Sequence, residues 1–297
     1  MNQHPLDTPL AVIYNLPMSR LSDIKKASVI PAIDEFDRVG RGEFLAKYGF
    51  GRAETYFLKF GDELYDSKAI VGRAYGYDFP EHGPLHSSEF SGGENTVEAL
   101  LTGLGFEVVP DVSALLLPEH RWSRDEVLSR PSPVPAKKGV YAWYFREVPS
   151  GVPVAAHLKH NGYALLYVGI APDKRRMDGK PSQERLRARI RFHFEGNAEG
   201  STLRLSLGCL LGLELRRVGS GRRRTFGKGE KRLSEWMELN AFVAWIEHSQ
   251  PWTVEKYLIE ELSPPLNLKD NEANPFYPTL CQLRKDTRAN ADKLEVV

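Results

Sequence analysis

Three prolines within five residues interrupt this chain of 297 residues near its middle, in the run Pro131-Ser132-Pro133-Val134-Pro135. Proline lacks a backbone N–H and fixes φ, so neither a helix nor a central strand can pass through such a run. The sequence therefore predicts two domains, at residues 1–112 and 138–297, joined by a linker over residues 113–137. We expect the part that follows the linker to fold by itself.

The composition is that of a globular protein, with 41% hydrophobic and 27% charged residues. No apolar run is long enough to span a bilayer, and the first residues lack the basic and apolar regions of a signal peptide. Cys209 and Cys281 lie too far apart for a zinc-type motif. We therefore expect a reduced, cytoplasmic protein, whose oligomeric state stays open, with a homodimer as one option.

Positive charge is concentrated in one part of the chain, although the net charge is only +1. Between Pro181 and Ser234 there are 13 Lys and Arg against 5 Asp and Glu. The triplet Arg222-Arg223-Arg224 lies in a stretch rich in glycine and serine, which predicts a loop. An isolated basic triplet is as often a solvated surface run as a phosphate-binding loop. This stretch alone leaves both interpretations open.

Mixed helices and strands are expected before the prolines, which indicates the α+β class. Apolar residues at helical spacing predict a helix from Ser19 to Lys47, broken or kinked at Pro31. The other expected elements are a hairpin of residues 56–60 and 63–65, a helix that begins near Asp66, a helix from about Asn95 to Gly103, and a strand over residues 106–109.

Two short segments after the prolines each carry a tyrosine and a glycine. One begins Gly139-Val140-Tyr141 and the other contains Tyr167-Val168-Gly169. Each is expected to be a strand, residues 139–145 and 165–170, with Leu165 and Tyr167 on the same face. Antiparallel pairing would bring the two phenols close together. A single strand tyrosine is more often a half-buried packing residue, so the interpretation depends on the residues that follow.

A helix is expected over residues 182–194, with Arg189 and His193 four residues apart and therefore on one face. Arg187 and Arg191 have the same spacing, so spacing alone leaves both pairs open. The planar guanidinium group suits phosphate because it donates paired hydrogen bonds and stays charged.

Glu255 lies near the start of a second expected helix, capped by Thr253 and ended by Ser263-Pro264-Pro265. An acid in the first turn is also explained by the helix dipole. As a hard oxygen ligand, however, Glu255 suits Mg²⁺, which keeps most of its waters. Leu266 and Asn267 follow the prolines.

Together, residues 138–270 resemble the GIY-YIG nuclease family, which implies a small antiparallel sheet flanked by helices. The family pattern Leu-x-x-Arg-Ile selects Arg189 and leaves Arg187 and Arg191 as phosphate contacts. The resemblance implies hydrolysis with one Mg²⁺ or Mn²⁺ on Glu255, an Arg189 contact to phosphate and a positioning role for Asn267. Proton removal from water would use Tyr141 assisted by His193, with Tyr167 placing water or phosphate; which tyrosine is the base stays open.

Residues 30–110 resemble the head domain of McrA-type restriction endonucleases. The similarity is carried by Phe44–Gly51, Tyr65–Ile70, Phe90–Gly93 and Leu104–Val108. In this domain Lys68 is a candidate DNA contact, with Lys47, Arg52 and Arg73. Beside a nuclease site, the triplet Arg222-Arg223-Arg224 is also expected to contact DNA. The two resemblances imply a metal-dependent DNA endonuclease of a restriction or defence system. A structure-specific repair nuclease and a catalytically inactive DNA-binding module are the alternatives.

Overall fold

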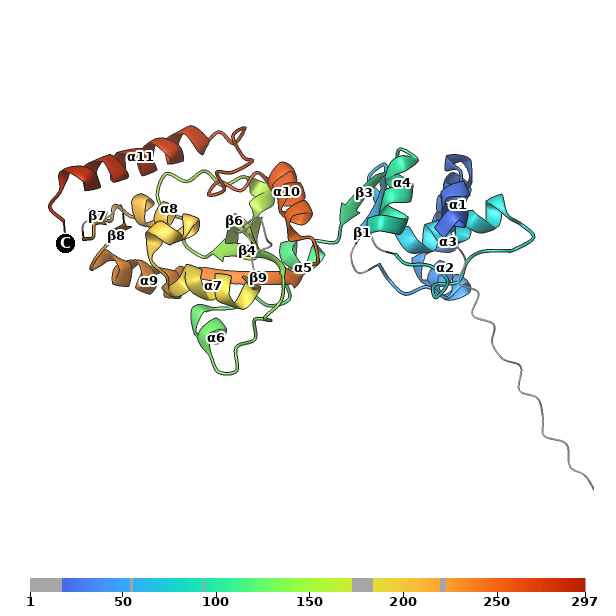
Figure 1. The fold of residues 1–297 in the computed structure, drawn as a ribbon, viewed down its shortest axis with the longest axis horizontal. Helices are drawn as coiled ribbons and strands as arrows, with labels where there is room; N and C mark the ends of the chain where they lie inside the picture. The colour runs from blue at the N-terminus through green and yellow to red at the C-terminus, as the bar shows by residue number, and fades with distance from the viewer. Residues whose placement is uncertain (1–17, 54–55, 93, 173–183, 220–222, 297) are drawn as a thin grey trace, which may run out of the picture. The chain divides into compact units, whose positions relative to one another are not determined.

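The computed structural model describes residues 18–53, 56–92, 94–172, 184–219 and 223–296. The chain divides into two compact units, residues 1–111 and 112–297 (Figure 1). Each unit combines helices with an antiparallel sheet, which confirms the expected α+β class. Among the described residues, no helix is long and apolar enough to cross a membrane.

The first unit is a three-stranded antiparallel sheet in the order β2-β1-β3, packed against helices. The expected hairpin is confirmed as β1 and β2, in which Phe60 pairs with Glu63. The elements are η1 (Met18–Asp23), α1 (Lys26–Val39), α2 (Arg41–Tyr48), β1 (Tyr56–Phe60), β2 (Glu63–Asp66), α3 (Ser67–Asp78), η2 (Glu94–Glu98), α4 (Ala99–Gly103) and β3 (Glu107–Pro110).

The first long helix breaks at Gly40 and not at Pro31. Pro31 lies inside α1, while Gly40, at φ 84°, separates α1 from α2. A proline inside a helix costs one backbone hydrogen bond, and the complete burial of Val29 and Ile33 on this helix offsets that loss. Glycine adopts positive φ without strain, so the turn forms there.

The carboxylate of Glu35 joins the three main helices of this unit. It is 3% exposed and accepts hydrogen bonds from Lys47 Nζ (2.7 Å), Arg73 Nε (2.6 Å), Tyr77 Oη (2.9 Å) and Tyr48 Oη. Burial alone would raise the pKa of Glu35, but these four donors lower it far below its ordinary value. Of the two residues expected to contact DNA, Arg73 is therefore largely enclosed beside Glu35, whereas Lys47 pairs with Glu35 from an exposed position.

The second unit contains a four-stranded antiparallel sheet in the order β5-β6-β4-β9. Its strands are β4 (Gly139–Phe145), β5 (Lys159–His160), β6 (Tyr163–Ala171) and β9 (Ala241–Glu247). Its helices are α5 (Ser113–Leu116), α6 (Arg124–Leu128), η3 (Ala156–Leu158), α7 (Leu186–Glu195), η4 (Ala198–Gly200), α8 (Thr202–Leu210), α9 (Gly229–Asn240), α10 (Pro251–Leu262) and α11 (Tyr277–Lys293). A small ribbon pairs β7 (Arg216–Arg217) with β8 (Arg224–Thr225).

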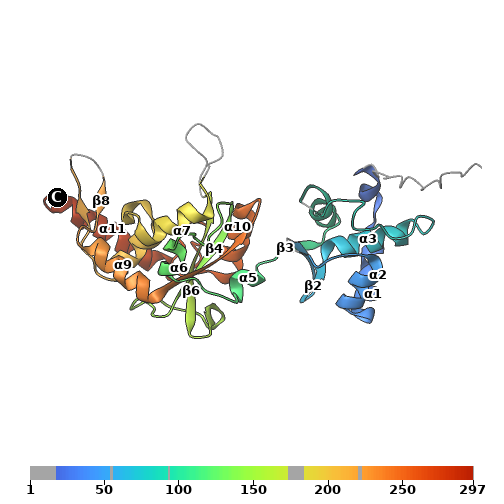
Figure 2. The same ribbon diagram turned by 90° about the horizontal axis from the view of Figure 1, so that it is seen from below.

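Helices cover both faces of this sheet (Figures 1 and 2). Tyr141, Trp143 and Phe145 face one cluster, to which α7 contributes Leu186, Ile190 and Phe194. The alternate residues Val140, Ala142 and Tyr144 face the other, which includes Leu115 of α5 and Val254, Leu258 and Ile259 of α10. The two-residue period of strand β4 thus separates the two layers.

An irregularity in β6 corrects the expected face of Leu165. Trp143 pairs with Tyr167, but the next residue, Tyr144, pairs with Leu165, so Leu166 is the extra residue of a bulge. Leu165 consequently joins the α10 side of the sheet, while Tyr167 lies on the α7 side with Tyr141. The prediction that Leu165 and Tyr167 share a face was wrong because it assumed a regular strand.

Residues 112–137 are part of the second unit and not a free linker. Leu115 and Val134 are fully buried, and Val127 is nearly so. Trp122 exchanges two backbone hydrogen bonds of 2.9 Å with Val243, which extends the sheet beyond β9. No helix or strand crosses the proline run, as expected, but its residues pack onto the domain because Val134 enters the core. The boundary therefore lies at Asp111.

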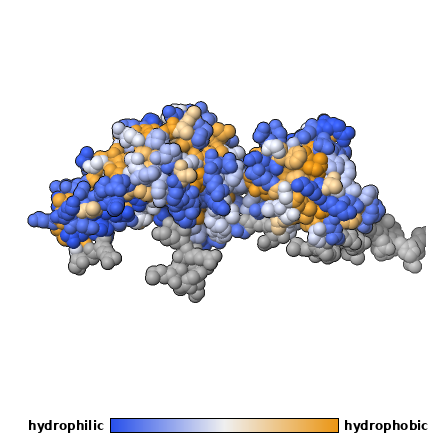
Figure 3. Space-filling model, turned by 90° about the horizontal axis from the view of Figure 1, so that it is seen from above, coloured by the Kyte–Doolittle hydropathy of each residue, from blue (hydrophilic) through white to orange (hydrophobic). Residues whose placement is uncertain are grey.

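The segment after Asn271 also belongs to the fold, although its polar sequence gave no signal. It forms α11, which lies along α8 (Figure 1). Leu280 and Ala291 are fully buried, and Arg284 Nη1 donates to Ser206 Oγ at 3.4 Å. The visible face of each unit is mostly hydrophilic, with scattered hydrophobic residues (Figure 3).

The domain boundary can be tested with two fragments. Residues 112–297 should fold, whereas residues 132–297 should be destabilised by on the order of 5 kcal/mol, because Leu115 and Val127 leave their core positions empty. All five tryptophans lie after residue 112, so tryptophan fluorescence during urea unfolding follows this unit alone. Equal stability of the two fragments would contradict the boundary at Asp111.

Candidate active site

A cavity of about 120 Å³ lies beside β6 in the second unit. Tyr167 and Ile170, which face opposite sides of the sheet, both line it, so the cavity sits at the edge of this strand. Five of the six expected catalytic residues contribute to its wall: Tyr141, Tyr167, Arg189, Glu255 and Asn267. They come from two strands, two helices and a loop, and the fold brings them together.

The phenol of Tyr141 reaches the cavity by lying across Gly169. These residues are direct partners in the β4–β6 ladder. A Cβ atom on Gly169 would lie 2.6 Å from Tyr141 Oη, so any larger residue would displace the phenol. Gly139 has a similar role at the start of β4, where a Cβ would lie 2.1 Å from the carbonyl oxygen of Ile246. The two glycines thus permit the close strand contacts that place Tyr141.

His193 lies behind Tyr141 and not on the cavity wall. Its Nε2 is 2.7 Å from Tyr141 Oη, and its Nδ1 is 2.8 Å from Ser201 Oγ. Burial, and then the charges of Arg189 and Arg204, lower the pKa of His193 well below its ordinary value. The imidazole is therefore neutral at physiological pH. Burial and the neighbouring Tyr167 raise the pKa of Tyr141, while Arg189 partly offsets this.

Arg189 is the arginine of α7 that faces the cavity. It is only 9% exposed, its charge partly offsets the raised pKa of Tyr141, and its Nη1 lies 3.9 Å from the Glu184 carboxylate. The neighbouring arginines point elsewhere. Arg187 Nε donates to the carbonyl of Val134 at 2.7 Å, and exposed Arg191 pairs with Glu195. Of these three arginines, the helix register therefore places only Arg189 on the cavity wall.

Glu255 lies one turn into α10, which begins at Pro251 after Gln250. Thr253 was expected to cap this helix but lies within its first turn, because proline occupies the first helical position, which it favours. Among the described residues, no three His, Cys, Asp or Glu side chains form a metal-binding group. A single carboxylate beside a cavity nevertheless fits Mg²⁺ that takes its other ligands from water and substrate phosphate.

Asn267 fixes the outer edge of β6. Its Oδ1 accepts from Val168 N and its Nδ2 donates to Val168 O, both at 2.9 Å. Leu266 N also donates to the bulged Leu166 carbonyl at 2.9 Å. The loop therefore completes the hydrogen bonding of β6 next to Tyr167. This geometry agrees with the expected positioning role.

Three residues near the cavity were missed in the sequence. Lys269 and Thr202 line its wall, and Ser201 contacts His193 from the start of α8. Lys269 lies two residues after Asn267, so its nearness to an expected site residue could have been noticed in the sequence. Ser201 and Thr202 are ordinary residues for a helix start, and only the tertiary structure reveals their neighbours.

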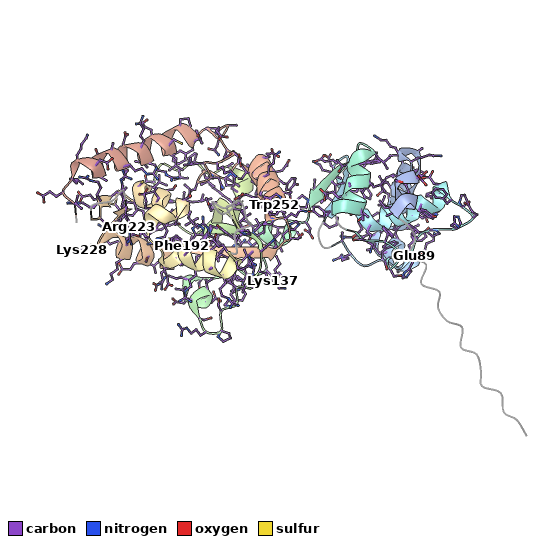
Figure 4. All side chains as sticks on the ribbon, viewed as in Figure 1. Glu89, Lys137, Phe192, Arg223, Lys228 and Trp252 are labelled. Atoms are coloured by element: carbon purple, nitrogen blue, oxygen red, sulfur yellow. The ribbon has the colours of Figure 1, made fainter. Side chains whose placement is uncertain are left out.

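The basic ribbon lies away from the cavity. In Figure 4, Arg223 and Trp252 of α10 are at opposite ends of the second unit. Arg223 is exposed, and Arg222 lies outside the described residues. Arg224 pairs with Asp292 at 2.9 Å and lies 3.9 Å from Glu199. Of the triplet, Arg223 is thus a surface cation, while Arg224 connects β8 to α11.

Lys68, the expected DNA contact in the first unit, lines a cavity of about 370 Å³ together with exposed Arg52. Its Nζ donates to the carbonyl of Ser87 at 2.6 Å and lies over the ring of Phe90. Burial lowers the pKa of Lys68. The side chain therefore has internal partners, and Arg52 is the more accessible cation.

Comparison with protein families agrees with this organisation. Residues 139–286 match the GIY-YIG catalytic domain, and residues 22–110 match the ScoMcrA-like N-terminal head domain. The searches of curated proteins and of solved structures gave no significant match.

Replacing Asn267 by aspartate should destabilise the second unit by about 2–3 kcal/mol. The carboxylate loses the donor to Val168 O and places negative charge beside that carbonyl. Asn267→Ala should cost less than Asn267→Asp, because it adds no charge. Urea unfolding followed by tryptophan fluorescence measures both. An aspartate variant as stable as the unaltered protein would contradict this account of Asn267.

Proposed function

We propose that this chain is a metal-dependent DNA endonuclease of restriction type, because residues 139–286 match the GIY-YIG catalytic domain and residues 22–110 match the ScoMcrA-like head domain. The head domain binds DNA or selects the target, and the second unit cuts. The observation that carries the proposal is the convergence of Tyr141, Arg189 and Glu255 on one cavity.

The protein's own side chains provide the contacts that phosphodiester hydrolysis needs. Arg189 binds a non-bridging oxygen and stabilises the charge that develops on it. Tyr141 takes a proton from the attacking water once its own hydroxyl proton has left to water in the cavity, and His193 is hydrogen-bonded behind its oxygen. Tyr167 orients the water or the phosphate from the same wall.

Glu255 holds the divalent cation, Mg²⁺ or Mn²⁺. The cation supplies Lewis acidity at the phosphate and the leaving oxygen. Asn267 has no role as a ligand here, because both ends of its amide bind Val168. Exposed Lys269 adds a positive charge at the wall, where DNA phosphates would approach.

Cleavage of plasmid DNA should require Mg²⁺ or Mn²⁺ and stop in EDTA. Glu255→Gln should reduce cleavage by at least about 100-fold while leaving DNA binding intact, because only the ligand charge is removed. Glu260→Gln on the exposed face of the same helix is the matched control and should cut normally.

Modified and unmodified plasmids, compared side by side, test the restriction role. Binding without any cutting would support an inactive DNA-binding module, and preference for branched DNA would support a repair nuclease.

Arg189→Ala should lower kcat by about 10²-fold or more, as expected for loss of a transition-state contact. Arg191→Ala should instead weaken binding and reduce its salt dependence, because an exposed arginine contacts phosphate equally before and during the reaction. Steady-state cleavage at several salt concentrations separates the two effects. If Arg191→Ala lost turnover and Arg189→Ala did not, the proposed roles would be reversed.

A further inference from the structure

Ser201 lies at the inner end of a buried chain of hydrogen bonds that leads to the cavity. Its hydroxyl contacts His193 Nδ1, and His193 Nε2 contacts Tyr141 Oη. Ser201 and His193 are 0% exposed and Tyr141 is 1% exposed, so water does not exchange freely with these groups. The direction of each hydrogen bond is therefore set by the protein groups themselves.

The hydrogen bond between His193 and Tyr141 can have either direction, and the two directions imply different chemistry. If Nε2 is unprotonated, His193 can accept the proton of Tyr141 when that hydroxyl takes one from water. If Nε2 carries the proton, His193 donates to Tyr141 and stabilises negative charge on its oxygen. A neutral imidazole has one N–H, so Nδ1 decides between them.

The hydrogen bonds of Ser201 favour the second arrangement. Ser201 caps α8, and its Oγ accepts the backbone N–H of Arg204 at 3.2 Å. Within the described part of the chain, the other partner of Oγ is His193 Nδ1. A buried hydroxyl proton needs an acceptor, and Nδ1 is the acceptor within reach. Ser201 O–H therefore donates to Nδ1, which leaves the imidazole proton on Nε2.

The surrounding charges point the same way. The guanidinium groups of Arg189 and Arg204 both act on His193. Arg204 is 1% exposed and donates to the carbonyl of Phe194 at 2.7 Å, next to His193 in α7. A second proton on the imidazole would place a third positive charge between two buried cations. His193 is consequently a poor proton acceptor and a suitable neutral donor.

We propose that Ser201 is a positioning residue that holds His193 in the Nε2–H tautomer, so that His193 donates a hydrogen bond to Tyr141 and does not take its proton. Tyr141 Oη then accepts from His193, and its own hydroxyl proton faces the cavity, where it leaves before the oxygen takes a proton from the attacking water. This inference rests on the proposed nuclease function and specifies how one part of that site is held.

The tautomer can be measured directly by ¹⁵N NMR on the full chain, through two-bond couplings between ring nitrogens and carbon-bound protons. The spectrum of His193→Gln identifies the His193 signals by their absence. We expect Nδ1 to show the downfield chemical shift of an unprotonated ring nitrogen. Nε2 should show the upfield chemical shift of a protonated ring nitrogen. An unprotonated Nε2 would overturn the proposal. This readout needs no DNA, so it is independent of whether the protein cuts.

Variants of Ser201 connect the tautomer to turnover. Ser201→Ala should shift the tautomer and lower kcat by about 10- to 100-fold with little change in KM. Ser201→Thr keeps the hydroxyl and the cap and should retain the Nε2–H tautomer and most of the activity. Unchanged tautomer and turnover in Ser201→Ala would refute the role.

Loss of the helix cap is a separate effect of Ser201→Ala, and Asn197→Ala controls for it. Asn197 Oδ1 caps the neighbouring η4 by accepting from Glu199 N at 2.9 Å. This variant should lose stability by about 1 kcal/mol and keep the His193 tautomer and kcat. If Asn197→Ala lowered kcat as much as Ser201→Ala, the effect would be structural. If the unaltered protein cut no DNA under any condition, the proposed function would fail while the NMR result would still decide the tautomer.

Discussion

The contact of the Tyr141 phenol with the backbone of Gly169 is the constraint on which the site depends. It requires β4 and β6 to pair in one register, because only glycine leaves space for the ring. That register puts Tyr167 on the same face and presents Tyr141 Oη to His193. Helix α7 is thereby oriented so that Arg189 faces the cavity. Tyr167, His193 and Arg189 are thus placed relative to one aromatic ring.

Much of this organisation could be predicted from local sequence. Tyr141 and Arg189 were identified by their spacing and family pattern, and the hairpin by its glycine turn, because these signals act over a few residues. The bulge at Leu166 and the partners of Asn267 depend on strands that meet only after folding. Ser201 was missed for the same reason, since its partner lies eight residues away across a turn.

The proline run shows how a correct local inference can lead to a wrong boundary. Proline does exclude helix and strand from residues 131–135, as expected. It does not prevent those residues from packing, and Val134 between two prolines is fully buried. Arg187 even uses its side chain to hold the carbonyl of Val134. An irregular backbone that lacks donors can therefore cover a domain, provided that neighbouring side chains satisfy its carbonyl groups.

The Glu35 cluster gives the head domain a defined response to acid. A carboxyl group whose pKa is lower in the folded than in the unfolded chain adds its full stability above the unfolded pKa, near 4.3, and loses it progressively as pH falls from there through the folded value. Because the pKa of Glu35 is lowered far, its contribution persists through mildly acidic conditions. Acid would therefore weaken the junction of the three helices around Glu35 gradually, over the whole interval between the unfolded and the folded pKa.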